Sequence, residues 1–270
     1  MTEGNAKHKD KLFGFIFGTR GSREWTLSLY NAVNHSHYDD PAAIEINIIQ
    51  NTMYLGMRND VSFIIADEMN IYEQQSSFNP NMPLRMFLYA AHLYEKYLEE
   101  HGLNNKAVYS TKLVELQLPK LVVFYNAERW QPDEMTFKLS DAFKSKNSKP
   151  DIEVQVKMLN INYGHNKELL ESCKVLGEYA WITAEIRAHK ELELKYAIDR
   201  AIINMPKEFI LKKFLLIRRA EVMGMLVAEY DSDEAKEIYL EDERERIFNE
   251  LVADGMSPEK AAKYTRISLD

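Results

Sequence analysis

The chain has 270 residues, of which 46% are hydrophobic and 11% are aromatic. This composition is typical of a protein that buries a core, and it excludes an intrinsically disordered chain. The single cysteine, Cys173, excludes an internal disulfide and is compatible with a reducing compartment. The first residues lack the apolar core of a signal peptide, and Lys and Arg interrupt the most apolar later stretch at residues 209–227. The sequence therefore predicts a cytoplasmic protein without a membrane partner.

The net charge of −8 counts against nucleic-acid binding when it is taken for the whole chain. However, residues 221–250 hold eleven acids and three bases, which leaves 31 acids and 31 bases in the rest of the chain. All of the excess charge therefore lies in one stretch with a helical pattern. We interpret this stretch as a solvated helix, and an acidic flap that competes with nucleic acid for a basic groove is the weaker alternative.

Periodicity and turn residues predict, in chain order, one helix, three strands, a second helix and a fourth strand. The second helix would be the crossover that returns the fourth strand to the sheet in parallel. Its apolar side chains Leu84, Phe87, Leu88, Ala91 and Leu98 are expected to be buried. The predicted elements are a helix at 23–33 capped by Ser22, extended segments at 43–57, a hairpin of 60–66 with 71–75, a helix at 84–99 and a strand at 120–125.

The C-terminal half has a different pattern. Residues 141–151 are polar and lysine-rich, which is typical of a linker, residues 151–161 alternate like another strand, and the chain is almost wholly helical from Asn166. This pattern predicts an α/β core at 1–140, with a mixed sheet flanked by helices, and a mainly helical region at 141–270. The last stretch, ADGMSPEKAAKYTRIS, also looks like half of a helix-turn-helix, although a plain helix pair is the favoured interpretation.

The hairpin brings three polar residues together. If its turn centres on residues 67–68, Asp60 lies opposite Gln75 and residue 62 lies opposite Glu73, so Asp60, Glu73 and Gln75 share one face. Two neighbouring carboxylates repel each other unless a cation lies between them, and Mg²⁺ suits such ligands. Gln75 would orient a water molecule or a phosphate oxygen. The spacing by itself still favours an ordinary hydrated sheet edge.

A family resemblance changes this balance. The segments NDVSFII, YEQQSSFNPNMPLRMFLYAAHLYEKYL, LPKLVVFYN and INYGHNKELLESCKVLGEYAWI resemble the Rpn family of recombination-promoting nucleases and transposase-related proteins. This family belongs to the PD-(D/E)XK nuclease superfamily, whose core has the element order αβββαβ. The resemblance covers most of the chain and agrees with the order of elements read from the residues.

The resemblance implies a role for particular residues. Asp60 and Glu73 would be the motif acids and the ligands of Mg²⁺, with Mn²⁺ as a substitute, and Gln75 would occupy the lysine position of the motif. Glu24 matches, less closely, an acid that some members use as an extra ligand. The implied activity is metal-dependent hydrolysis of DNA phosphodiester bonds, linked to recombination or mobile elements. DNA is the implied partner, and double-strand cleavage with one site per chain is compatible with a homodimer.

Several other polar residues are candidates for phosphate contact. Arg85, Tyr89, His92 and Lys96 form one stripe at helical spacing, and an arginine there could hold a phosphate with two hydrogen bonds. A solvated helix face is the equal alternative. The segment HSHYDD at residues 35–40 is interpreted as a polar turn and not as a transition-metal site. Further candidate phosphate contacts are the basic clusters Lys7–Lys11, Lys144–Lys149 and Lys212–Arg219.

Two competing functions stay open at this point. The first is a catalytically inactive DNA- or protein-binding transposase relic, which the glutamine at the lysine position favours. The second is a structural interaction protein built on the helical half. An intact site should bind Mg²⁺ or Mn²⁺ through Asp60 and Glu73, whereas neither alternative requires it.

Overall fold

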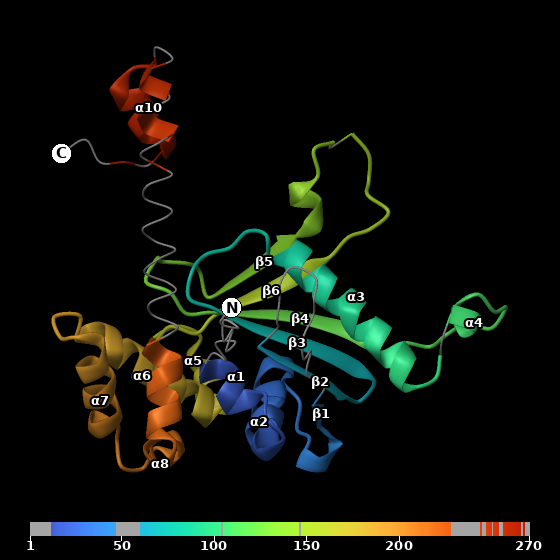
Figure 1. The fold of residues 1–270 in the computed structure, drawn as a ribbon, viewed down its shortest axis with the longest axis horizontal. Helices are drawn as coiled ribbons and strands as arrows, with labels where there is room; N and C mark the ends of the chain where they lie inside the picture. Colours follow the sequence, from blue (N-terminus) through green and yellow to red (C-terminus); the bar gives the residue numbers. More distant parts are fainter. Residues whose placement is uncertain are drawn as a thin grey trace, which may run out of the picture.

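A six-stranded mixed sheet with helices over both faces forms the centre of the molecule (Figure 1). The computed structural model describes residues 12–46, 60–103, 105–145, 147–227, 244, 247–249, 251–253, 256–265 and 267. The strands are β1 (Glu45–Ile46), β2 (Val61–Ile65), β3 (Glu68–Gln75), β4 (Leu118–Tyr125), β5 (Glu134–Lys138) and β6 (Gln155–Asn160). The helices are α1 (Leu12–Phe17), α2 (Arg23–Asn34), α3 (Met82–Glu100), α4 (Asn105–Val108), α5 (Lys167–Ser172), α6 (Lys174–Ala188), α7 (Leu194–Asn204), α8 (Ile210–Ile217) and α10 (Pro258–Thr265).

The strand order is β1-β2-β3-β4-β6-β5. The first three strands pair antiparallel, β3, β4 and β6 are parallel to one another, and β5 returns antiparallel to β6. Helix α3 makes the crossover between the parallel strands β3 and β4. The predicted α/β class, the mixed sheet and the order from α2 to β4 are therefore confirmed, although residues 47–59 of the predicted extended segments lie outside the described residues.

The hairpin register differs from the prediction. Ala66 and Asp67 form a two-residue turn with φ angles of 50° and 59°, so β3 starts at Glu68 and not at residue 71. Such positive φ angles match the twist of a tight hairpin, but they are usually supplied by Gly or Asn, which explains why the predicted centre of the turn was one residue too far along the chain. Val61 pairs with Tyr72, which places Asp60 beside Glu73 instead of Gln75.

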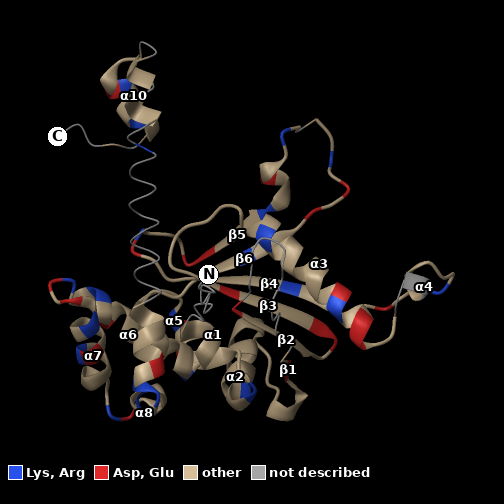
Figure 2. Ribbon diagram, viewed as in Figure 1, with Lys and Arg blue, Asp and Glu red and all other residues tan. Residues whose placement is uncertain are grey.

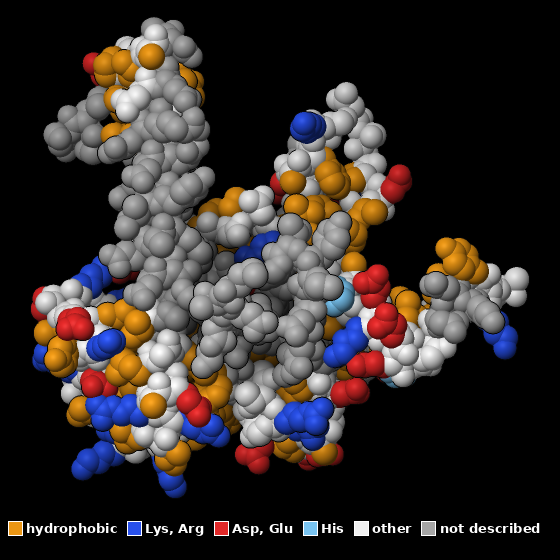
Figure 3. Space-filling model, viewed as in Figure 1, with side chains coloured by type: hydrophobic (Ala, Val, Ile, Leu, Met, Phe, Trp, Pro, Cys, Tyr) orange, Lys and Arg blue, Asp and Glu red, His pale blue; other side chains and the backbone are white. Residues whose placement is uncertain are grey.

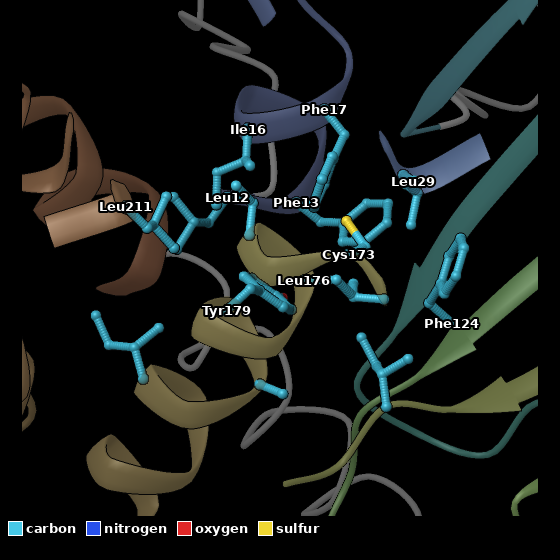
Figure 4. Close-up of a cluster of buried hydrophobic side chains, with 14 of the residues drawn as sticks. Leu12, Phe13, Ile16, Phe17, Leu29, Phe124, Cys173, Leu176, Tyr179 and Leu211 are labelled. Atoms are coloured by element: carbon cyan, nitrogen blue, oxygen red, sulfur yellow. The ribbon is translucent and has the colours of Figure 1, made fainter. Parts of the chain in front are cut away.

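Two hydrophobic clusters cover the two faces of the sheet. Figure 4 shows the larger one, where side chains of α1, α2, α6 and α8, together with Cys173, meet Phe124 of β4. The smaller cluster joins α3 to the opposite face through Met86, Tyr89 and Leu93. The predicted buried face of α3 is therefore wrong, since Leu84 and Leu88 are 48% and 36% exposed. The helix carries two apolar stripes, and periodicity does not reveal which one faces the sheet.

The sheet extends across residue 140. Strand β6 lies between β4 and β5, so the boundary expected near residue 140 falls between two paired strands of one sheet. The larger hydrophobic cluster likewise joins residues from both sides of that boundary. In the part of the chain that the structure describes, no helix is both long and apolar enough to cross a membrane.

Candidate active site at the carboxyl edge of the sheet

The parallel strands end side by side. Gln75 at the end of β3 is in register with Tyr125 at the end of β4, and Tyr125 is in register with Asn160 at the end of β6. In open α/β sheets, ligands bind in the crevice outside the carboxyl ends of parallel strands. The predicted site residues Glu73 and Gln75 lie at this edge.

Glu73 and Gln75 form one hydrogen-bonded group with Arg85 and Tyr89 of α3. The Arg85 Nη2 atom lies 2.6 Å from Glu73 Oε1 and donates to the Tyr89 hydroxyl at 2.9 Å. The Gln75 Nε2 atom also donates to Glu73 Oε1, at 3.1 Å. Because alternate residues of a strand share a face, Glu73 and Gln75 both point toward α3. The structure therefore brings together four of the predicted residues.

Asp60 completes this group from the start of β2. Its backbone N–H donates to Glu73 Oε2 at 3.2 Å, and its own Oδ2 accepts the N–H of Gln74 at 2.6 Å. Helix α1 packs closely against this point, since a Cβ added to Gly14 would lie 2.9 Å from the Asp60 carbonyl oxygen. A glycine at this position thus allows the close approach that fixes Asp60.

The cluster is buried and its charges are strongly coupled. Glu73 is only 1% exposed, and the Arg85 side chain is 27% exposed. Burial by itself lowers the pKa of Arg85, but Glu73, Tyr89 and Asp60 together raise this pKa above its ordinary value. Burial, followed by the charge of Glu73, raises the pKa of Tyr89 to about 12. Arg85 therefore stays a cation and Tyr89 stays a neutral hydroxyl across the physiological range.

The donor set suits Mg²⁺ only after a rearrangement. Mg²⁺ commonly takes one or two carboxylates and keeps several waters, which Asp60 and Glu73 can provide. Glu73 Oε1, however, already accepts hydrogen bonds from Arg85 and Gln75. Among the described residues, no three His, Cys, Asp or Glu side chains gather as a metal site. A divalent ion that bound Glu73 Oε1 would have to displace the Arg85 guanidinium from this oxygen.

Two of the predicted site residues lie elsewhere. Glu24 is exposed on α2 and lines an open groove of about 940 Å³ with His35, His37 and Glu168, so no described contact joins it to Glu73. This groove also contains most of the HSHYDD segment. Lys96 lies further along α3, where its Nζ is 3.6 Å from Glu100.

Of the basic clusters, Lys7–Lys11 lies outside the described residues. Lys212 donates to the carbonyl oxygens of Ile203 and Met205, and Arg219 pairs with Asp199 at 2.7 Å. Figure 2 shows both basic and acidic residues in the region of α7 and α8, and Figure 3 shows hydrophobic side chains among them. The cluster Lys212–Arg219 is therefore partly used in internal contacts, and neighbouring acids pair with Arg218 and Arg219.

Sequence reasoning missed a second polar group at the same edge. Arg187 of α6 donates to Asn126, which follows β4, and to Asn162, which follows β6. Asn126 in turn donates its backbone N–H to the carbonyl oxygen of Gln75 at 2.8 Å. The only sequence signal was an amide directly after each of two apolar strands, which is weak evidence because asparagine is also common in turns.

Comparisons with known proteins add no family assignment. No protein-family model, no curated protein and no solved structure matches the chain.

Proposed function

We propose that the chain is a metal-dependent DNA endonuclease of the PD-(D/E)XK type, similar to the Rpn family. The observation that supports this proposal most strongly is the convergence of Asp60, Glu73 and Gln75 with Arg85 at the carboxyl edge of the sheet. The element order from α2 to β4 is the order expected of such a core. The link to recombination or mobile elements rests on the resemblance alone.

In this proposal each side chain has a distinct task. Asp60 and Glu73 would hold a divalent ion, which when bound supplies Lewis acidity toward a phosphate oxygen. The Gln75 amide would orient the attacking water, because it can both donate and accept but cannot transfer a proton at neutral pH. Arg85, displaced from Glu73, would bind the phosphate with its planar fork of donors. The Tyr89 hydroxyl would keep the guanidinium near this edge.

A second candidate function is a non-catalytic nucleic-acid- or protein-binding relic. The contact between Arg85 and Glu73 favours it, because a buried carboxylate that already has a cationic partner needs no metal ion. The two candidates differ in one measurable property. A relic has no requirement to bind Mg²⁺ or Mn²⁺ through Asp60 and Glu73.

The test is cleavage of supercoiled plasmid in Mg²⁺ or Mn²⁺ by the wild type, Asp60→Ala and Asp151→Ala. Asp151 is an exposed aspartate before β6 and serves as the matched control. Nicking by the wild type and Asp151→Ala, but not by Asp60→Ala, would support the nuclease. Cleavage by all three proteins would point to a contaminant or a different site. If none of them cleaves and calorimetry detects no metal binding, the nuclease proposal is wrong and the relic is favoured.

A further inference from the structure

We propose that Arg187 forms a second phosphate-binding site at the carboxyl edge, separate from the Asp60–Glu73 cluster. The nature of its ligand, a nucleic-acid phosphodiester, rests on the proposed function. The existence of an anion site rests only on the geometry of Arg187. Among the described residues the guanidinium is held by neutral groups, and these contacts leave one pair of its N–H donors unused.

Three hydrogen bonds fix the Arg187 guanidinium. Its Nη1 atom donates to Asn126 Oδ1 at 2.6 Å and to Asn162 Oδ1 at 3.0 Å, and its Nη2 atom donates to the Asn126 carbonyl oxygen at 2.6 Å. A guanidinium has five N–H donors, so these contacts leave the Nε–H and one Nη2–H. Those two donors lie on the same edge of the group and match the spacing of two phosphate oxygens.

The charge of Arg187 is not neutralised by its neighbours. Within the described parts of the chain no carboxylate pairs with it, whereas Arg85, Arg218 and Arg219 each contact an acid. Amide and carbonyl oxygens orient a guanidinium but leave its full charge available to an external anion. Because Arg187 is already immobilised at the end of α6 and only partly exposed, binding there orders no further side chain.

The position of Arg187 suits a ligand that also reaches the candidate active site. Asn126, which holds the guanidinium, is hydrogen-bonded to the Gln75 carbonyl oxygen at 2.8 Å. Adjacent strands are about 5 Å apart, so one nucleic-acid strand along the edge could contact both places. Helix α6 contributes to the larger hydrophobic cluster and α3 to the smaller one. Arg187 and Arg85 therefore approach the edge from opposite faces of the sheet.

The acid that follows Asn126 does not oppose this role. Glu128 follows Asn126 by two residues, and the Lys190 Nζ atom lies 2.6 Å from its Oε1. Its charge is thus already balanced by a lysine. The surroundings of Arg187 favour an anion with at least two acceptor oxygens, and a phosphodiester has two.

The test measures binding of labelled duplex DNA by fluorescence anisotropy in EDTA, where no cleavage occurs, at several salt concentrations. Arg187→Gln is compared with Arg200→Gln, which removes the same charge from an exposed position on α7. We expect Arg187→Gln to weaken binding by about 10- to 100-fold, the effect of a charged hydrogen-bonding pair, and to reduce the salt dependence by about one phosphate contact. Equal affinities of the two variants would overturn the proposal.

A second variant guards against a folding defect. Asn126→Asp keeps the shape of the residue and its acceptor for Arg187, but it places a carboxylate on the guanidinium. We expect the same loss of DNA binding in protein that still unfolds cooperatively on heating, with the Thr183 hydroxyl donating to the new carboxylate where it now accepts from the Asn126 amide. A folded Asn126→Asp protein that binds DNA as well as the wild type would contradict the proposal.

The source of the phosphate is tested with inorganic phosphate in the same variants. If Arg187→Gln loses affinity for both DNA and inorganic phosphate, the nucleic-acid site is supported. Loss of phosphate binding with unchanged DNA binding would overturn the nucleic-acid assignment and leave a site for free phosphate. If the wild type binds DNA through Arg187 but never cleaves plasmid, this inference stands and the proposed nuclease activity fails.

Discussion

The contact between Arg85 and Glu73 leads to a quantitative prediction about stability. Glu73 Oε1 accepts hydrogen bonds from Arg85 at 2.6 Å and Gln75 at 3.1 Å, and Oε2 accepts the Asp60 N–H at 3.2 Å. In Arg85→Met the two N–H donors remain, but the ion pair between Arg85 and Glu73 is lost. Removing one partner of a buried ion pair typically costs about 3–5 kcal/mol. Since Arg85 is 27% exposed, water can reach the site, and we expect Arg85→Met to lose about 3 kcal/mol of its free energy of unfolding.

The complementary substitution should cost less. Glu73→Gln leaves a cation that is partly exposed and can be hydrated, so we expect a loss of about 1–2 kcal/mol. The double variant Arg85→Met with Glu73→Gln removes both charges of the pair. The double variant should lose about 2 kcal/mol less free energy of unfolding than the sum of the losses of the two single variants. This difference is the coupling free energy of the pair. Urea unfolding in EDTA measures all four proteins under two-state conditions.

The metal dependence of the same proteins tests the proposed site. With Arg85 removed, a divalent ion can occupy the oxygen that the guanidinium held, and ligand at 100 times its dissociation constant stabilises a protein by about 2.7 kcal/mol. We therefore expect Mg²⁺ or Mn²⁺ to stabilise Arg85→Met more than the wild type. The ions should not stabilise the double variant. A loss below about 1 kcal/mol in Arg85→Met, or equal metal effects in both variants, would refute competition between Arg85 and the ion.

Three further predictions concern groups around the site. The pKa of Tyr89 is raised from 10.0 to about 12, so stability present below pH 10 is lost as the pH rises toward 12. In urea unfolding, the free energy of unfolding of Tyr89→Phe should therefore fall by about 2–3 kcal/mol less than that of the wild type over this pH range. Glu178 accepts two backbone N–H groups at the start of α8, at 3.0 and 2.7 Å, so Glu178→Ala should cost about 1.5–3 kcal/mol and lower the thermal unfolding temperature more than Glu178→Gln does. Gly14→Ala should displace Asp60, lower the free energy of unfolding by about 1–3 kcal/mol and weaken divalent-ion binding in calorimetry. The control Gly21→Ala has nothing within 4 Å of the added Cβ, so it should leave the free energy of unfolding and the ion binding unchanged.

The sequence predicted the element order and the shared face of the site residues for a physical reason. The hairpin register was wrong, because Asp60 lies beside Glu73 and not beside Gln75. Moving the partner along a strand by two residues keeps every side chain on its original face, since side chains alternate with a period of two. The shared face of Asp60, Glu73 and Gln75 was therefore predicted correctly although the predicted position of the turn was wrong. An error of one residue would have placed Glu73 on the other face.

The buried face of α3 could not be predicted in the same way. Leu84 and Leu88 form one apolar stripe and Met82, Met86 and Leu93 form another, and both have helical spacing. The choice between them depends on how the helix crosses the sheet, which is a tertiary property. This choice has a direct consequence for the site. The same rotation that buries Met86 turns Arg85 and Tyr89 toward the end of β3.

The contact of Arg85 with Glu73 also explains why sequence reasoning assigned the two residues to separate tasks. Glu73 fitted a metal motif and Arg85 fitted a phosphate contact, and twelve residues of chain separate them. Under the proposed function they would compete for Glu73 Oε1, which accepts a hydrogen bond from the guanidinium in the folded chain. Under the proposed function the two tasks are therefore compatible only if Arg85 leaves Glu73 when the ion arrives. The freed guanidinium would then be available to the phosphate. Removal of Arg85 should therefore raise the affinity for the divalent ion and lower the affinity for the nucleic-acid substrate.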